Sequence, residues 1–247
     1  IAREISALLE TKLNIPDIDE ECEFPIKKLD FTNHCQEAIN SECIYTITSI
    51  NNVDGSISSP EWLRNRLEKS DIKSINLLVD ITNYILLEQG QPLHAFDKDK
   101  LSNLIKKEVS PLDFGVRKAK ENEQIKAIDG NTYQLNKKIT IITCSDIPIA
   151  IAGVIGGHDT AVSDSTKNIY LEAAVFNPSS IRKSTKEIGL KTESSSRYEK
   201  GISSRNTIFA LKRSLTIINK FYKIPKSHIY TTDDSKITEK FIKLRRE

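Results

Sequence analysis

The stretch NYILLEQGQPLHAFD, residues 83–97, carries more information about this chain than any other segment of it. Its apolar first half predicts a helix that ends at Gly90, and a Gln-Pro-Leu turn then holds His94 at the helix exit. Histidine has the side-chain pKa closest to neutrality, so a histidine fixed there suits proton transfer or the positioning of water. A structural histidine that caps the turn is the alternative, and this segment alone favours it.

The overall composition bounds the class of protein. The 247 residues are 38% hydrophobic and 28% charged, which allows one large domain or two small ones with a proper core. The chain has 36 Lys and Arg against 34 Asp and Glu, and the two signs are interspersed. A net charge of +2 does not describe a free-standing nucleic-acid binder with a concentrated basic face. We see no signal peptide, and no apolar run approaches the roughly 20 residues of a membrane span.

The cysteines indicate the compartment. Cys22, Cys35, Cys43 and Cys144 show no CxxC spacing and no nearby His/Cys cluster. The pattern argues against a zinc site and against a disulfide framework, and it favours reduced thiols in a cytoplasmic protein. A pair between Cys35 and Cys43 stays open as an alternative.

The two ends of the sequence suggest a piece of a larger polypeptide. The chain begins at Ile1, contains no methionine, and shows helical spacing of apolar residues from Ile1 to Leu13. We therefore expect its first residue to lie already inside an amphipathic helix. Residues 14–43 carry prolines and scattered acids without periodicity, which predicts a linker.

The remaining pattern predicts the fold class. Ser59-Pro60-Glu61 predicts a helix start with a hydroxyl cap, and a second, largely apolar helix is expected from near Ser74. Two further helices are expected, one from Asn177-Pro178 to Gly189 and one over 204–222. Strands are expected at 44–50, 104–109, 115–120, 125–128, 133–135, 139–144, 149–154 and 169–176, with a hairpin turn at Asp129-Gly130. This order predicts an α+β fold in which helices pack against a mostly antiparallel, sandwich-like sheet.

Three downstream segments accompany the histidine. Gly156-Gly157 follows an apolar strand, and Glu172 is a carboxylate within an otherwise apolar strand. Thr192 and Ser194 lie in a segment, 192–199, that reads as a polar loop between two helices. Each feature has a plain alternative: a turn, a glutamate that faces solvent, and a solvated serine-rich loop.

Taken together, these segments resemble the editing module of the beta subunit of bacterial phenylalanyl-tRNA synthetase. Their order and approximate spacing agree with that family from about residue 40 to residue 225. The matching segments are SPEWL (59–63), VDITNY (79–84), QPLHAFD (91–97), AGVIGG (152–157), LEAA (171–174) and RYEKG (197–201). The resemblance implies the end of a preceding module and a linker over 1–43, the editing domain over 44–225, and a linker towards the next module over 226–247.

The resemblance also implies a function. That family charges tRNA(Phe) in an α2β2 enzyme whose alpha subunit binds ATP, Mg²⁺ and phenylalanine, so no cofactor is expected in this chain. The editing module takes the aminoacylated 3′ end of tRNA(Phe) and hydrolyses Tyr-tRNA(Phe). An aminoacyl ester is already activated, so this hydrolysis requires neither a metal nor an enzyme nucleophile.

The matching positions imply a role for each site residue. His94 would position the attacking water, and Glu172 would accept a hydrogen bond from the tyrosine phenol. Gly156 and Gly157 would form the floor under the aromatic ring, and their N–H groups would face the ester carbonyl. Thr192 and Ser194 would line the pocket wall.

Two alternatives remain open. One is a free-standing aminoacyl-tRNA deacylase that edits in trans, and the other is a structural domain with an inactive pocket. Ser194 stands where the family often has alanine, and Ser196 stands where histidine can occur. Both departures lie at the expected pocket, so they bear on the alternative of a structural domain with an inactive pocket.

Overall fold

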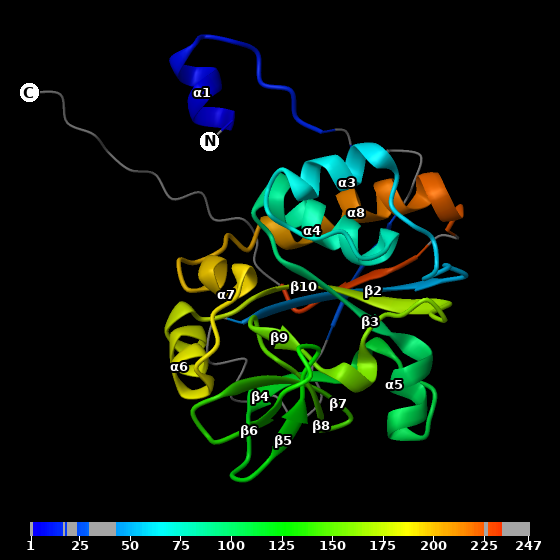
Figure 1. Cartoon of the computed structure of the whole chain (residues 1–247), viewed down its shortest axis with the longest axis vertical. Coiled ribbons are helices and arrows are strands. Elements are labelled where there is room, and N and C mark those ends of the chain that lie inside the picture. The colour runs from blue at the N-terminus through cyan, green and yellow to red at the C-terminus, as the bar shows by residue number, and fades with distance from the viewer. Residues whose placement is uncertain (1, 17, 19–23, 30–42, 225–226, 234–247) are drawn as a thin grey trace, which may run out of the picture.

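A five-stranded sheet forms the centre of the computed structural model, which describes residues 2–16, 18, 24–29, 43–224 and 227–233 (Figure 1). Its strands, in spatial order, are β1 (Ile26–Lys28), β11 (Ile229–Thr231), β2 (Ile44–Asn51), β10 (Asn168–Val175) and β3 (Leu93–Asp97). Only the β1–β11 pair is parallel, and the other neighbours are antiparallel.

A second, smaller layer of strands packs on one face of this sheet (Figure 1). It consists of β4 (Phe114–Lys118), β7 (Thr140–Cys144), β8 (Ile147–Ile151) and β9 (Ile155–Gly156), in that spatial order. A hairpin of β5 (Gln124–Lys126) and β6 (Thr132–Gln134) extends this layer, and its turn contains Asp129 and Gly130 as predicted. The predicted α+β class with mostly antiparallel strands is thus confirmed.

Helices cover the opposite face of the five-stranded sheet and the flanks of the smaller layer (Figure 1). The covering helices are α3 (Glu61–Glu68), α4 (Leu77–Gln89) and α8 (Asn206–Tyr222). The flanking helices are α5 (Lys98–Ile105), α6 (Pro178–Ile188) and α7 (Glu193–Tyr198), with short 3-10 turns at Pro111–Asp113 and His158–Thr160. Among the described helices, none is long and apolar enough to cross a membrane.

The two faces of β10 bury different cores because side chains alternate along a strand. Ile169, Leu171 and Ala173 pack with the helical layer. Tyr170 and Ala174 instead face the four-stranded sheet, in a cluster that also contains Phe96. Glu172 has the same parity as Tyr170, so its carboxyl points between the two sheets and not to solvent.

Two helix starts differ from the prediction. Pro60, not Ser59, is the N-cap of α3, and the Ser59 hydroxyl donates to Oδ2 of the buried Asp80 at 2.6 Å. Helix α4 starts later than predicted, where the Asn76 side chain accepts from the Val79 N–H at 3.0 Å. In both cases a side chain satisfies a buried polar group that the sequence pattern alone does not reveal.

Two further elements were predicted wrongly. The strand expected at 104–109 is absent, and helix α5 occupies part of that range because Asp97 caps it through the Asp99 and Lys100 N–H groups. The loop expected at 192–199 is largely helix α7, whose N-cap is Thr192. By contrast, α6 begins after the Asn177 cap and ends at Gly189, as predicted.

The segments assigned to linkers contribute strands to the central sheet. β1 comes from the range 1–43 and β11 from the range 226–247, and they pair with each other and, through β11, with β2. The expected N-terminal helix is present as α1 (Ala2–Leu8), with Leu8 82% exposed. Cys35, the partner in the alternative pairing with Cys43, lies outside the described residues.

A candidate active site between the two sheets

The turn after helix α4 sets the position of His94. Gly90 adopts φ +73° as the helix C-cap, and its N–H donates to the Leu86 carbonyl at 3.0 Å. The next residue, Gln91, is fully buried, and its Nε2 donates to the Ala174 carbonyl of β10 at 2.9 Å. This bond fixes the chain beside β10 just before β3 begins.

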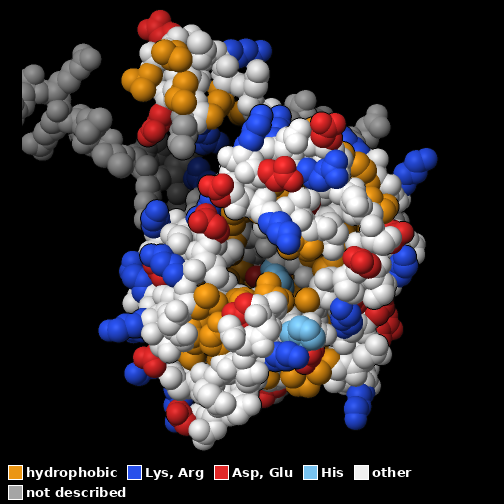
Figure 2. Space-filling model, in the orientation of Figure 1, with side chains coloured by type: hydrophobic (Ala, Val, Ile, Leu, Met, Phe, Trp, Pro, Cys, Tyr) orange, Lys and Arg blue, Asp and Glu red, His pale blue; other side chains and the backbone are white. Residues whose placement is uncertain are grey.

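The β3–β10 register then places His94 directly opposite Glu172. Directly opposed residues in an antiparallel pair lie on the same face with Cβ atoms about 5 Å apart. Both side chains therefore enter the space between the two sheets. Figure 2 shows a hollow at this level, with histidine and acidic side chains inside it and hydrophobic side chains around its rim.

The side chain of His94 is half-buried and packs against an aromatic ring. Its ring stands edge-on to Phe96, with centroids 4.5 Å apart and planes at 77°. Within the described part of the chain, its Nε2 is buried and has no hydrogen-bond partner. Burial lowers the pKa of His94 to about 4, so the ring is neutral at pH 7. A neutral ring with an unpaired buried nitrogen suits the binding of a water or ligand atom.

Gly156 lies against the same ring. A Cβ added at this glycine would stand 2.4 Å from Cε1 and 2.7 Å from Nε2 of His94. The glycine is therefore required by close approach to the histidine, in addition to any contact with a substrate ring.

We expect Gly156→Ala to lower the free energy of unfolding by about 1–3 kcal/mol, because the methyl group would displace the imidazole. In a His94→Ala background the same change should cost under about 1 kcal/mol, since the obstructing ring is gone. Urea unfolding of the four chains of this cycle measures the coupling. Additive effects would show that Gly156 does not act through His94.

The N–H group of Gly157 is already engaged within the sheet. Its N–H donates to the Ile149 carbonyl at 2.9 Å, so it is not available to an ester carbonyl. A Cβ here would stand 2.5 Å from that same carbonyl oxygen. The sheet pairing of Gly157 thus corrects the expectation for its N–H group, and the absence of a side chain permits the close approach to Ile149.

Glu172 is 3% exposed and belongs to a buried polar cluster. Its Oε2 accepts a hydrogen bond from the Tyr45 hydroxyl at 3.1 Å. Burial raises the pKa of Glu172 to about 8, although the Tyr45 bond lowers it somewhat. The charge of Glu172 also raises the pKa of the buried Tyr198 phenol, after burial itself. The carboxyl is therefore mostly protonated at pH 7 and can both donate and accept.

This raised pKa predicts a pH-dependent stability. A carboxyl that holds its proton more tightly when folded stabilises the fold below its unfolded pKa, and this stability is lost as pH rises towards about 8. Relative to Glu172→Gln, the unaltered chain should lose on the order of 3 kcal/mol of unfolding free energy between about pH 5 and pH 8. Urea unfolding of both chains at several pH values measures the difference. The lowered pKa of His94 has the opposite effect on stability, which falls as pH drops below the ordinary pKa of histidine. Because the Glu172→Gln variant retains His94, the comparison of the two chains cancels this contribution.

Thr192 and Ser194 differ in what the structure shows for them. The Thr192 hydroxyl donates to the Val154 carbonyl at 2.9 Å and accepts from the Ser195 N–H at 3.1 Å. It thereby ties α7 to the turn that leads into β9 and Gly156. Ser194 is half-buried in the first turn of α7, whereas the fully buried Ser195 completes the capping box.

The sequence interpretation missed Tyr45, Gln91 and Tyr198. Alternation along 44–50 could have placed Tyr45 on the buried face, since Ile47 shares its parity. Gln91 is the more important of the missed residues. Its Oε1 is buried without a hydrogen-bond partner among the described residues, so this atom can accept a hydrogen bond. No local pattern marks Tyr198, which reaches the cluster only through the packing of α7.

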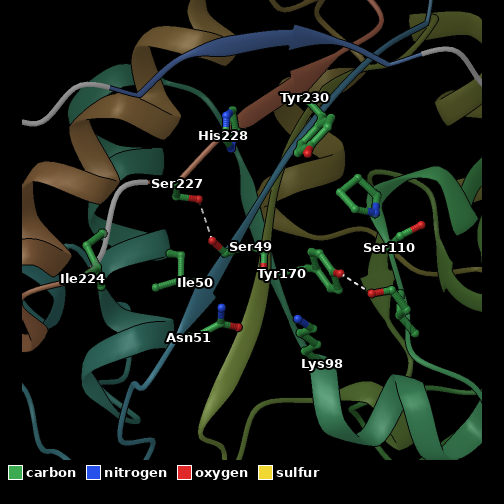
Figure 3. Close-up of a pocket in the computed structure, with 12 residues that line it drawn as sticks. Ser49, Ile50, Asn51, Lys98, Ser110, Tyr170, Ile224, Ser227, His228 and Tyr230 are labelled. Carbon is green, nitrogen blue, oxygen red and sulfur yellow. Dashed lines mark hydrogen bonds between the residues drawn. The ribbon is translucent and has the colours of Figure 1, made fainter.

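A separate cavity of about 290 Å³ opens further along the same strands (Figure 3). Tyr170 lines it, and the Tyr170 hydroxyl donates to the Val109 carbonyl at 2.6 Å. Its other labelled lining residues are Ser49, Ile50, Asn51, Lys98, Ser110, Ile224, Ser227, His228 and Tyr230. None of the predicted site residues is among them, so the cavity is distinct from the His94–Glu172 site.

In the described parts of the chain, no group of three or more His, Cys, Asp or Glu side chains is arranged to hold a metal ion. The site instead combines a neutral imidazole with an unpaired nitrogen and a protonated carboxyl in an apolar setting. Such a pair can hydrogen-bond a water and a polar ligand group at the same time.

The chain is similar to known proteins over most of its length. The B3/4 domain family matches residues 42–223. The phenylalanine--tRNA ligase beta subunit of Prochlorococcus marinus (strain MIT 9312) is 59% identical over 246 residues, which are 100% of this chain and 30% of that protein. The same subunit from Prochlorococcus marinus subsp. pastoris is 58% identical over 247 residues, again 100% of this chain and 30% of the relative.

A more distant relative, the phenylalanine--tRNA ligase beta subunit of Parasynechococcus marenigrum (strain WH8102), is 37% identical over 246 residues, again 100% of this chain and 30% of that protein. The chain thus spans about 30% of the length of these relatives. Because the family match covers well over half of the residues, the chain belongs to the B3/4 domain family.

Proposed function

We propose that this chain is the editing module of a phenylalanine--tRNA ligase beta subunit and hydrolyses Tyr-tRNA(Phe). The observation that carries the proposal is the direct pairing of His94 with Glu172 across β3 and β10, on a buried face. The pairing brings together the His94 imidazole, which is suited to bind a water, and the Glu172 carboxyl, which is suited to hydrogen-bond a phenol. The beta-subunit names of the relatives support the context of tRNA charging.

Selection of tyrosine follows from the buried carboxyl. A pocket shaped for a phenyl ring discriminates only about 100-fold against the same ring with an added hydroxyl. A pocket that hydrogen-bonds the hydroxyl rejects phenylalanine much more strongly, because phenylalanine leaves a buried polar group unpaired. Glu172 is such a group, since it is buried and faces the interior between the sheets.

Hydrolysis would proceed by direct attack of water. The water oxygen bonds to the ester carbonyl carbon, the bond from that carbon to the ribose oxygen breaks, and the ribose hydroxyl recovers a proton. With its pKa lowered to about 4, His94 is a weak base, so its contribution would be to orient the water at Nε2. Gly156 would keep the space beside the ring open.

The proposal assigns partners and setting. The 3′ end of aminoacylated tRNA(Phe) would be the substrate, and the alpha subunit of an α2β2 enzyme would be the protein partner in the cytoplasm. ATP and Mg²⁺ would serve the synthetic reaction in that full enzyme. Thr192 and Ser194 would line the wall of the editing pocket.

Deacylation of Tyr-tRNA(Phe) and Phe-tRNA(Phe) by this chain tests the proposal. Selective loss of tyrosine from the tRNA is the expected result. Equal hydrolysis of both esters would contradict editing, and absence of hydrolysis in this chain and in the complete synthetase would favour an inactive pocket. Activity without the alpha subunit at the rate of the whole enzyme would instead favour a free-standing deacylase.

A further inference from the structure

Tyr45 contacts the one carboxyl that the proposed function uses to recognise tyrosine. In the β2–β10 register Ala174 pairs with Tyr45 and Glu172 pairs with Ile47, so Tyr45 and Glu172 are diagonal neighbours. Both side chains lie on the face towards the four-stranded sheet, and Tyr45 is fully buried. Diagonal neighbours of this kind are within reach of aromatic and long side chains.

The hydrogen bond between them occupies one oxygen of the carboxyl. The Tyr45 hydroxyl donates to Oε2 at 3.1 Å. The other oxygen, Oε1, makes no hydrogen bond to the described residues. A carboxyl with one oxygen held by a fixed donor loses the freedom to rotate about its last bond, and its second oxygen keeps a single direction.

We infer that Tyr45 is a positioning residue for tyrosine selection: it holds Oε2 of Glu172 and leaves Oε1 to meet the phenol of the substrate. The inference rests on the proposed function. The phenol of Tyr45 thus fixes the carboxyl that recognises the phenol of the ligand. With Oε2 engaged as an acceptor, the proton of the neutral acid resides on Oε1, where it can be donated to the ligand.

Of the titratable groups around the Glu172 carboxyl, Tyr45 is the one that holds it in place. Among the residues that the structure describes, the titratable side chains facing Glu172 are Tyr45 from β2, His94 from β3 and Tyr198 from α7. Tyr198 donates to the Pro92 carbonyl at 3.5 Å, and Nε2 of His94 has no hydrogen-bond partner among the described residues. Tyr45 is therefore the neighbour bonded to Glu172 itself.

The test compares Tyr45→Phe with Tyr170→Phe in the full chain. Tyr170 is a matched control because it is buried on the same face of β10, two residues from Glu172, yet donates to the Val109 carbonyl (Figure 3). Two readouts are taken. The first is the pH midpoint of the Glu172 carboxyl carbon by NMR with labelled glutamate, assigned with Glu172→Gln, and the second is the ratio of Tyr-tRNA(Phe) to Phe-tRNA(Phe) hydrolysis.

Tyr45→Phe should raise the midpoint by about one pH unit, because it removes a donor that favours the charged carboxylate, and should lower the hydrolysis ratio about tenfold. Tyr170→Phe should change neither readout. If the two variants shift the midpoint alike, or if they change an existing tyrosine preference alike, the inference is overturned. If the unaltered chain does not discriminate tyrosine from phenylalanine, the proposed function fails, and the midpoint comparison still decides whether Tyr45 positions Glu172.

Discussion

Replacement of His94 by alanine is expected to slow hydrolysis of Tyr-tRNA(Phe) by about 100-fold or more. The ring supplies the unpaired nitrogen of the site, and its removal leaves the attacking water without a fixed hydrogen-bond acceptor. The fold should survive, because the ring lies in a hollow beside Gly156 and a smaller side chain creates no clash there. Single-turnover deacylation with excess chain measures the rate directly.

His158→Ala provides the matched control for this experiment. His158 is 54% exposed and contacts Asp159 at 3.0 Å, so its side chain points to solvent although it follows Gly157 in the chain. Its replacement should leave the deacylation rate within about twofold of the original, since the loss of an exposed side chain rarely changes the geometry around it. Equal losses in the two variants would remove His94 from the mechanism.

Replacement of Glu172 by alanine is expected to lower the preference for Tyr-tRNA(Phe) over Phe-tRNA(Phe) by about 100-fold. In the proposed function the buried carboxyl would be a polar group that a phenol satisfies and a phenyl ring does not, and alanine would remove that requirement. Hydrolysis of Phe-tRNA(Phe) should therefore rise relative to that of Tyr-tRNA(Phe). The measurement is the ratio of the two single-turnover rates on the same tRNA.

Glu172→Gln separates the shape of this side chain from its charge. Burial raises the pKa of Glu172 to about 8, so the native side chain is mostly neutral at pH 7, as glutamine is. The glutamine variant should thus retain most of the tyrosine preference at pH 7, whereas alanine should not. Loss of preference in both variants alike would show that a negative charge, and not a neutral hydrogen-bonding group, selects the substrate.

The parts of the fold that were predicted from sequence depend on local chemistry. Gly90 ends α4 because a left-handed residue closes a helix, and Asn177 begins α6 because its side chain caps the first turn. The hairpin at Asp129-Gly130 follows from the same kind of local preference. Each of these signals involves residues a few positions apart, which a sequence displays directly.

The elements predicted wrongly were decided by their surroundings. The segment 104–109 is compatible with a strand, but the Asp97 cap and the burial of Leu101 select helix α5. In the segment 192–199, the bond from Thr192 to the Val154 carbonyl anchors a capped helix where serines alone suggested a loop. Tertiary contacts thus overrode a weak local preference in both places.

For the candidate site, the sequence by itself singled out the two residues on which the proposal rests, namely His94 after its glycine-ended helix and Glu172 in its apolar strand. Only the tertiary structure decided that they oppose each other, that Gly157 uses its N–H in the sheet, and that Tyr45 holds the carboxyl. The reason is physical: strand register and burial arise from contacts between distant segments, and these contacts set both the pKa values and the free hydrogen-bonding atoms of the site.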